Sequence, residues 1–182
     1  MISALKFVIQ AFATLFLLIL LLRFWMPWFR ADFRNPIAQG ILRLTSPLVI
    51  PIRRVVPPIG RLDTATVIIA FVIQYLTIWI ILALKSLAKG ITPIALTSII
   101  DLGMLSLRLF IVAIIIRIVL AWVAPHTYNP ATAIIGTIAE PLLRPFRRFV
   151  PPLGGIDISP IFALILFSAI YIMLSELRPL PI

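Results

Sequence analysis

Long apolar runs separated by short polar clusters dominate the chain, and they predict membrane-crossing helices. A helix needs about 20 mostly apolar residues to cross the hydrocarbon core of a bilayer. Runs of this length lie at about residues 2–26, 64–84, 102–124 and 158–177. The first is too long for a signal peptide, and no small-x-small cleavage motif follows it, so we interpret it as a retained span. The predicted fold class is an all-α membrane protein with four transmembrane helices.

Two proline-rich segments, residues 27–63 and 125–157, join these spans in pairs. They contain too much proline for a span and too many apolar residues for a free aqueous loop. In each, an Asn-Pro dipeptide predicts an N-cap and the first helical position, and a later proline predicts the restart of a second short helix. The dipeptides are Asn35-Pro36 and Ser46-Pro47 in the first segment, and Asn129-Pro130 and Glu140-Pro141 in the second. Apolar positions with arginines on one side favour amphipathic helices that lie in the membrane interface.

The two proline-rich segments are copies of each other. Residues 35–63 and 129–157 align without a gap, 94 positions apart, and 13 of the 29 pairs are identical. The chain is therefore a tandem duplication of helical hairpins, with repeats at residues 1–90 and 91–182. Each repeat crosses the membrane an even number of times, so both should have the same orientation, related by a pseudo-twofold axis along the membrane normal. The link between them is apolar but interrupted by Pro93, which predicts an interfacial segment up to about residue 100.

Composition agrees with a membrane protein and sets other classes aside. Of 182 residues, 62% are hydrophobic and only 12% charged, whereas a soluble domain is nearer half apolar and a quarter charged. The net charge of +10 fits the positive-inside bias of membrane proteins better than direct nucleic-acid binding, since the charges lie between apolar runs. Without cysteine, disulfides and thiolate metal sites are excluded, and the single His126 is interpreted as a solvated loop residue.

The distribution of positive charge predicts how the protein is inserted. Ten arginines, seven between residues 23 and 63 and three between residues 144 and 148, belong to the side of the proline-rich segments. The other side holds Lys6, Lys85, Lys89 and Arg178. The positive-inside rule therefore places both proline-rich segments in the cytoplasm and both termini on the outer face, as expected for a multi-pass protein of a bacterial inner (plasma) membrane.

The motif in the second copy resembles a known family. Residues 140–165 read EPLLRPFRRFVPPLGGIDISPIFALI, and the pattern EPxxxPxRRxxPPxGGxDxSP resembles the YggT family of integral membrane proteins, also called YlmG, with relatives in plastids. The first copy departs from this pattern at Ser46, Arg61 and Ala65. The resemblance implies a connection with osmotic-stress tolerance, potassium uptake, cell division and envelope organisation, and in plastids with nucleoid distribution and cytochrome assembly. It carries over no catalytic residues.

The duplicated arginine pairs, Arg53-Arg54 and Arg147-Arg148, are the first candidate site. One interpretation is that they set the topology and anchor the loops to anionic lipid headgroups, each arginine contributing about 1 kcal/mol near the surface. The other is a docking site for a specific anionic lipid or for an acidic partner, which could be another membrane protein or a second copy of the chain. Both interpretations stay open on the sequence.

Opposite charges at the same spacing in both repeats form the second candidate site. Arg23 and Arg117 lie near the end of the first span of each repeat, and Asp63 and Asp157 lie at the start of the second, so all four belong to one face of the membrane. We expect these charges to pair, either within each hairpin as Arg23 with Asp63 and Arg117 with Asp157, or across the pseudo-twofold axis, because charges at membrane depth are costly unless they are paired or snorkel. The alternative for each aspartate is a helix N-cap. The expected loop caps are Asn35, Asn129 and Glu140.

The third candidate is a polar path through the spans, formed by Gln74, Thr77, Asp101, Arg108 and Ser168. Asp101 and Arg108 are seven residues apart, hence on one helical face, and we expect them near the outer rim, paired or snorkelling. No selectivity-filter sequence and no ring of carboxylates accompanies them. No nucleophile, phosphate-binding or metal-ligand motif is present either, so we expect no enzyme, cofactor or metal. The sequence favours a non-enzymatic scaffold or assembly partner in envelope processes, with ion transport or potassium uptake as the alternative.

Overall fold

The structure is a computed structural model that describes residues 2–87, 89–123, 129–150 and 157–180. It is all-helical, with four helices long and apolar enough to cross a membrane, so the predicted fold class is confirmed. These four are α1 (Ile2–Trp28), α3 (Thr64–Leu84), α4 (Ile91–Val123) and α6 (Ser159–Glu176). The other two named helices, α2 (Pro36–Val55) and α5 (Pro130–Phe149), fall in the proline-rich segments.

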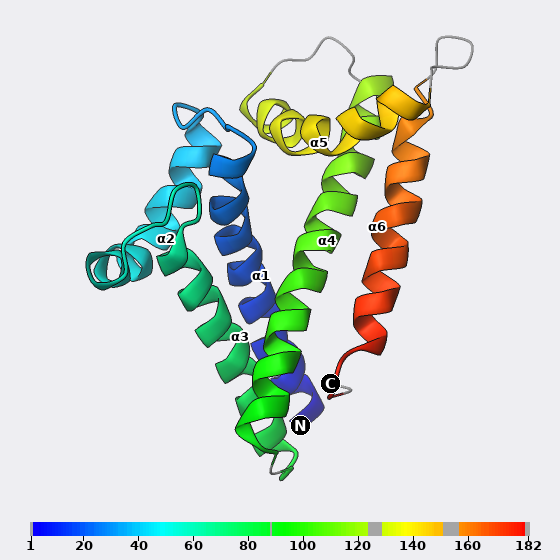
Figure 1. Ribbon diagram of the computed structural model, residues 1–182. Coiled ribbons are helices and arrows are strands. Elements are labelled where there is room, and N and C mark those ends of the chain that lie inside the picture. The colour runs from blue at the N-terminus through cyan, green and yellow to red at the C-terminus, as the bar shows by residue number, and fades with distance from the viewer. Residues whose placement is uncertain (1, 88, 124–128, 151–156, 181–182) are drawn as a thin grey trace.

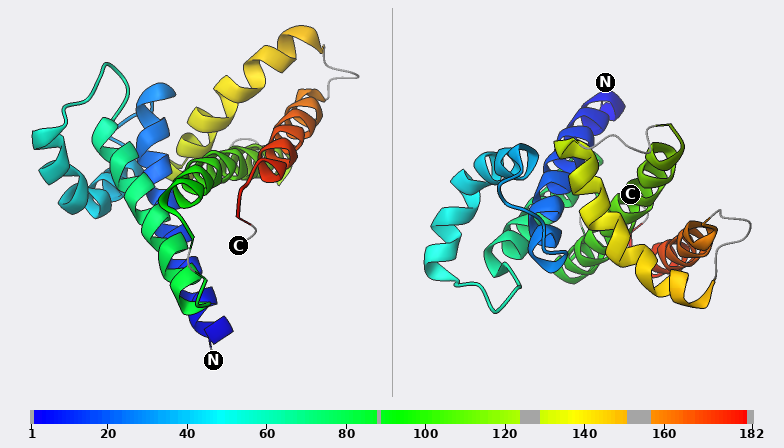
Figure 2. Two further views of the ribbon diagram at one scale, coloured as in Figure 1. Left: turned by 60° about the horizontal axis from the view of Figure 1, so that its bottom comes forward. Right: turned by 90° about the horizontal axis from the view of Figure 1, so that it is seen from above.

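The two repeats face the same way, as their even number of crossings predicts. In Figure 1, α2 and α5 both lie in the upper part of the molecule, and both termini lie in the lower part. Within the repeats α1 packs on α3 and α4 packs on α6, while α3 and α4 pack on each other across the repeat boundary. The view from above shows α5 crossing over the spans at this end, whereas α2 lies beside α1 and α3 at the edge of the molecule (Figure 2). Each repeat is thus a hairpin of two candidate spans with a further helix, α2 or α5, at its closed end.

Each proline-rich segment forms one long helix, so the predicted restarts at Ser46-Pro47 and Glu140-Pro141 are wrong. The inner prolines, Pro47 and Pro51 in α2 and Pro141 and Pro145 in α5, lie inside helices of 20 residues. Because the two prolines of each pair are four residues apart, they fall on one side of the helix. Each removes one backbone hydrogen bond, which bends a helix without necessarily ending it. The bend of α2 is visible in Figure 2.

The link before the third span is also helical, so the predicted interfacial segment up to residue 100 is wrong. Helix α4 begins at Ile91, and Pro93 falls in its first turn. The first backbone N–H groups of a helix have no partner within it, so a proline there costs no hydrogen bond. With 33 residues, α4 is about 50 Å long. Asp101 consequently lies ten residues inside the helix.

Aromatic side chains join the repeats near the end that carries α2 and α5. The ring of Trp25 on α1 lies edge-on to Phe110 of α4 at 4.9 Å, and Phe29 lies 5.9 Å from the same ring. Trp25 also donates a hydrogen bond to Ser106 of α4. The buried core around them contains Leu17 and Leu20 of α1, Ala65 and Ile69 of α3, and Leu109 of α4. Trp25 and Phe29 thus pack the end of α1 against the second repeat.

A single glycine permits the sharp return from α2 to α3. Gly60 has a φ of 60°, and the backbone on either side closes through hydrogen bonds between Ile59 and Leu62. A side chain at this φ would bring Cβ close to the following carbonyl oxygen. Glycine therefore provides the positive φ that this turn requires.

Replacing this glycine should weaken the protein. Gly60→Val should lower the free energy of unfolding by about 1–2 kcal/mol, the usual cost of the left-handed conformation for a residue with a Cβ. Chemical unfolding in detergent micelles would measure it. The matched control is Gly40→Ala within α2, where an added Cβ meets nothing within 4 Å and where helix propensity should raise stability by up to about 1 kcal/mol. Equal stability of Gly60→Val and the wild type would contradict the assignment.

Candidate functional site

The first repeat gathers two arginines around one buried aspartate, which we call the first cluster: Arg23, Arg53 and Asp63. Asp63 Oδ2 lies 2.6 Å from Arg53 Nη2 of α2 and 3.5 Å from Arg23 Nε of α1. The hydroxyl of Thr66, in the first turn of α3, donates to the same oxygen at 2.7 Å. The other carboxylate oxygen of Asp63 is buried and accepts no hydrogen bond from the described residues. One carboxylate thus connects the first three helices.

Arg23 is the most deeply buried charge of this cluster. Its side chain is only 5% exposed, which requires that its donors be paired, because an unpaired buried guanidinium is costly. Besides Asp63 it donates to the hydroxyls of Thr45 and Ser46, at 2.7 and 3.3 Å, and to the carbonyl oxygen of Leu42 at 3.4 Å. These three acceptors lie on one turn of α2. Arg23 therefore fixes where α2 crosses the end of α1.

The charge state of Asp63 follows from competing effects. Burial by itself raises the pKa of this carboxyl, but hydrogen bonds from Thr66 and Arg53 and the charges of Arg53 and Arg23 outweigh it. The pKa of Asp63 consequently lies below its usual range. The carboxylate is ionised at neutral pH, as pairing with Arg23 requires.

The second repeat builds a different arrangement at the same place, which we call the second cluster: Arg117, Glu140, Arg147 and Asp157. Arg117 lies 3.0 Å from Glu140, and Arg147 bridges Glu140 at 2.5 Å and Asp157 at 2.7 Å. The expected pairing of Arg117 with Asp157 is therefore not what the structure shows. Glu140 stands where the first repeat has Ser46, and this longer acidic side chain takes the arginine instead. All four side chains are between 38% and 41% exposed, far more than Arg23 and Asp63.

Both carboxylates of the second cluster are stabilised in their charged form. Burial raises the pKa of Glu140, but hydrogen bonds and charges from Arg147 and Arg117 bring it below its usual range. Burial likewise raises the pKa of Asp157, and hydrogen bonds from Ser159 and Arg147 more than reverse this. Desolvation lowers the pKa of Arg147, but its two carboxylate partners raise it above the ordinary value. The second cluster has two positive and two negative charges, whereas the first has one positive charge in excess.

The second arginine of each duplicated pair differs from the first. Arg53 and Arg147 are held by the carboxylates of the clusters. Arg54 and Arg148 are exposed, and neither forms an ion pair or hydrogen bond with any described residue. Sequence reasoning treated each pair as a unit and missed this division. The i, i+10 spacing of arginine and aspartate in both copies was the available signal.

Some of the predicted caps form and others do not. The side chain of Asn35 accepts from the N–H of Ile37 at 2.8 Å, and that of Asn129 accepts from Thr132 at 2.9 Å in a reciprocal capping box. The Asn35 amide also donates to the carbonyl oxygen of Pro130 at 2.8 Å, joining the first turns of α2 and α5. Asp157 accepts from the N–H of Ser159. The remaining two do not cap: Asp63 makes no capping hydrogen bond, and Glu140 lies inside α5.

The polar residues of the spans do not form the expected Asp101–Arg108 pair at the outer rim. Asp101 instead pairs with Arg178, at 2.9 Å, and accepts a hydrogen bond from Gln74 at 2.9 Å. Arg108 donates to the hydroxyl of Tyr171 and lies over its ring. Of the other members of the proposed path, Thr77 bonds to its own helix and Ser168 lies exposed on α6. These residues therefore do not form a continuous polar path. Gln74, Asp101 and Arg178 instead form a local group that joins α3, α4 and the segment after α6.

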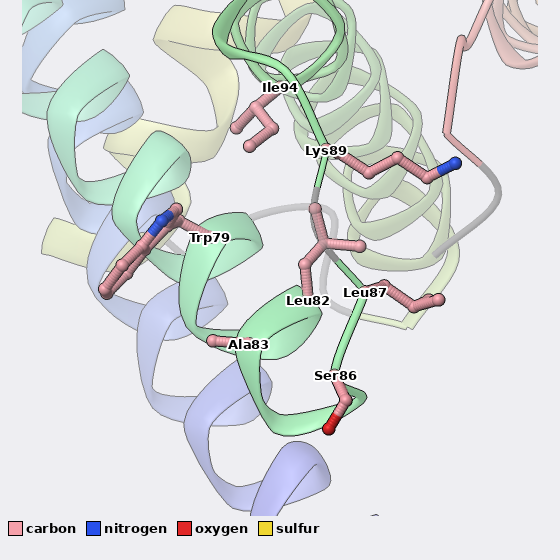
Figure 3. A pocket seen from close by; sticks show the side chains of 7 residues that line it. All are labelled: Trp79, Leu82, Ala83, Ser86, Leu87, Lys89 and Ile94. Carbon is pink, nitrogen blue, oxygen red and sulfur yellow. The ribbon is translucent and has the colours of Figure 1, made fainter.

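Other parts of the described chain offer less chemistry. A cavity of about 370 Å³ lies at the turn between α3 and α4, but Trp79 and Lys89 lie on opposite sides of that turn and do not converge (Figure 3). Within the described ranges, no three His, Asp or Glu side chains are gathered as a metal ion would need. His126 lies outside the described residues. The two clusters remain the most organised sites at the end formed by α2 and α5.

The difference in burial predicts unequal effects of removing the two aspartates. Asp63→Asn leaves Arg23 buried without a counter-charge and should lower the free energy of unfolding by about 3–5 kcal/mol. Asp157→Asn breaks a half-exposed pair and should cost about 0–1 kcal/mol. Unfolding in detergent micelles would compare them, with the exposed Glu176→Gln as the control. Equal losses for both aspartates would show that burial does not distinguish the clusters.

Comparisons with known proteins agree with the repeat and the motif. The sequence profile of the CCB3/YggT family matches the chain twice, at residues 2–84 and 96–178. An uncharacterized protein of Pseudomonas aeruginosa is 42% identical over 170 residues, covering 92% of this chain and 86% of its own length. The uncharacterized protein YggT of Escherichia coli is 32% identical over 174 residues, covering 96% of this chain and 90% of its own length. The chloroplastic YlmG homolog protein 2 of Arabidopsis thaliana is 38% identical over 66 residues, covering 35% of this chain and 25% of its own length.

No solved structure shows significant similarity to the chain. The family profile covers both hairpins, including the residues of the two clusters. The resemblance drawn from the motif is thereby confirmed, and the chain belongs to the CCB3/YggT family.

Proposed function

We propose that the protein is a non-enzymatic integral membrane factor that docks an acidic partner protein on α2 and α5, as a scaffold or assembly partner in envelope processes. The observation that carries this proposal is the division of the duplicated arginine pairs. Arg53 and Arg147 hold the fold together, whereas Arg54 and Arg148 are exposed and have no carboxylate partner among the described residues. Arginines that the fold does not use are available to a partner.

The distribution of side chains around α2 supports docking from the aqueous side. Thr45 and Val49 lie on its buried face. On a straight helix with about 100° per residue, Arg43 and Arg54, which flank the two prolines of the bend, fall within about 20° of each other and opposite that buried face. Most exposed apolar side chains of α2 lie between these two faces, namely Ile37, Leu44, Leu48 and Val55, whereas Ile50 lies on the arginine side. When this apolar side rests on the membrane, the two arginines point away from it.

Helix α5 has an equivalent arginine face. Arg144 and Arg148 are four residues apart, so they lie one turn above the other on the same side. Both are exposed, and they point away from the buried side chains of Ala139 and Leu143. Neither forms an ion pair with a described residue. A guanidinium group pairs bidentately with carboxylates as it does with phosphates, so arginines that point away from the membrane can bind an acidic segment of a partner protein.

The insertion proposed for this role has α2 and α5 in the cytoplasm, with both termini outside a bacterial inner membrane. The excess of arginine at the end formed by α2 and α5 supports it. The chain contains no cysteine, so single cysteines can be placed at will. In intact cells whose outer membrane has been permeabilised, a membrane-impermeant maleimide should label Lys89→Cys but not Arg54→Cys. Lysis should expose both, and the reverse pattern would overturn the orientation.

Docking itself is tested by photo-crosslinking from Phe149, which is 84% exposed beside Arg148. A crosslinker at this position should capture one defined protein in living cells. The variant Arg144→Glu with Arg148→Glu should insert normally and lose most of the capture, because repulsion replaces pairing. Arg144→Lys with Arg148→Lys keeps the charge and should retain part of it.

Lys85→Glu with Lys89→Glu is the matched control, since it makes the same charge change at the opposite end of the molecule. Capture should be unaffected there. Two results would reject the proposal: crosslinks to lipid alone, or unchanged capture of the same protein by the inserted Arg144→Glu, Arg148→Glu variant.

A further inference from the structure

A polar recess lies between the spans at the opposite end from α2 and α5. Its volume is about 180 Å³, and α1, α3, α4 and the segment after α6 contribute to its lining. The polar side chains that line it are Gln10, Thr14, Gln74, Asp101, Arg108 and Arg178. Neither of the two clusters and neither arginine face contributes to it, so it is independent of the proposed docking role.

The depth of the recess follows from helix lengths. Helix α6 has 18 residues and spans about 27 Å, close to the thickness of the hydrocarbon core. Arg178, two residues beyond its end, therefore lies near the headgroup level of this side. Because Arg178 reaches Asp101, this edge of the recess lies at the same level, and the recess extends inward to Gln74, midway along α3. Helices α3 and α4 extend farther, as Figure 1 shows, and leave the recess beside the shorter α6.

The recess has one positive charge in excess. Its single carboxylate, Asp101, is paired with Arg178 at 2.9 Å and also accepts from Gln74. Arg108 is bound to the neutral hydroxyl of Tyr171 and, within the described residues, has no carboxylate at ion-pair distance. A second carboxylate would be needed to attract a cation here, whereas an excess guanidinium attracts an anion.

Two further donors of the recess are open. Gln10 and Thr14 are four residues apart on α1, hence on one face, and both line the cavity. Neither makes a hydrogen bond to any described residue. An amide, a hydroxyl and a guanidinium from two different helices thus border one small volume, which is large enough for a tetrahedral oxyanion or several waters.

We propose that this recess binds a phosphate group, held by Arg108, Thr14 and Gln10, with the Asp101–Arg178 pair forming its wall. The group can come from free phosphate or from a phospholipid headgroup of the outer leaflet, since the chemistry of recognition is the same. The ion pair positions the wall, and the three side chains of α1 and α4 make the contacts.

The test uses the full-length protein purified in a phosphate-free sugar detergent. Inorganic phosphate, titrated at constant ionic strength, should raise the unfolding temperature in a saturable manner if free phosphate binds. If the source is a lipid, native mass spectrometry should instead show retained phosphatidylglycerol, and added phosphate should have no effect. In either case Thr14→Val with Arg108→Gln should weaken binding about ten-fold or more, because it removes two donors, one of them charged.

Thr77→Val is the control, because the hydroxyl of Thr77 bonds to its own helix and does not line the recess. It should leave phosphate or lipid binding unchanged. The proposal fails if wild type and the double variant bind both probes equally. It also fails if neither probe binds wild type, or if chloride stabilises the protein as well as phosphate does.

Discussion

A guanidinium group cannot be buried at the end of a membrane span without a partner, and this constraint organises the first repeat. Arg23 is almost fully covered, so its donors must be satisfied by the segments that cover it. The Asp63 carboxylate and the acceptors on one turn of α2 meet that need. In doing so they place α2 across the end of the hairpin and hold the start of α3 beside the end of α1.

Duplication followed by divergence explains why the same positions behave differently in the second repeat. The exchange of Ser46 for Glu140 adds a carboxylate within reach of Arg117 and Arg147. That carboxylate makes the second cluster electrically neutral. Because it pairs with Arg117, Asp157 pairs with Arg147 alone among the described residues. In the first cluster Arg23 and Asp63 are buried and one positive charge is in excess, so α2 and α5 are both 20-residue helices that differ in electrostatics.

The two ends of the molecule present different polar chemistry. At the end formed by α2 and α5, the clusters use the first arginine of each duplicated pair, and the second arginine remains exposed on a curved amphipathic helix. At the other end, the short α6 leaves a donor-rich recess beside the longer α3 and α4. Both features arise because the spans are apolar and of unequal length, so charged groups collect mainly where a span ends or a neighbouring span is shorter.

The sequence alone determined the approximate positions of the spans, the duplication and the common orientation of the repeats, and it offered the pairing of Arg23 with Asp63 as one of several alternatives. These follow from local hydropathy, chain length and the number of crossings, which do not depend on packing detail. Only the tertiary structure decided that α2 and α5 continue through their prolines, that Pro93 begins α4, and that Arg117 and Asp101 pair with Glu140 and Arg178. The physical reason is competition: a proline bends or ends a helix according to what its neighbours pack against, and an arginine pairs with whichever carboxylate packing brings nearest.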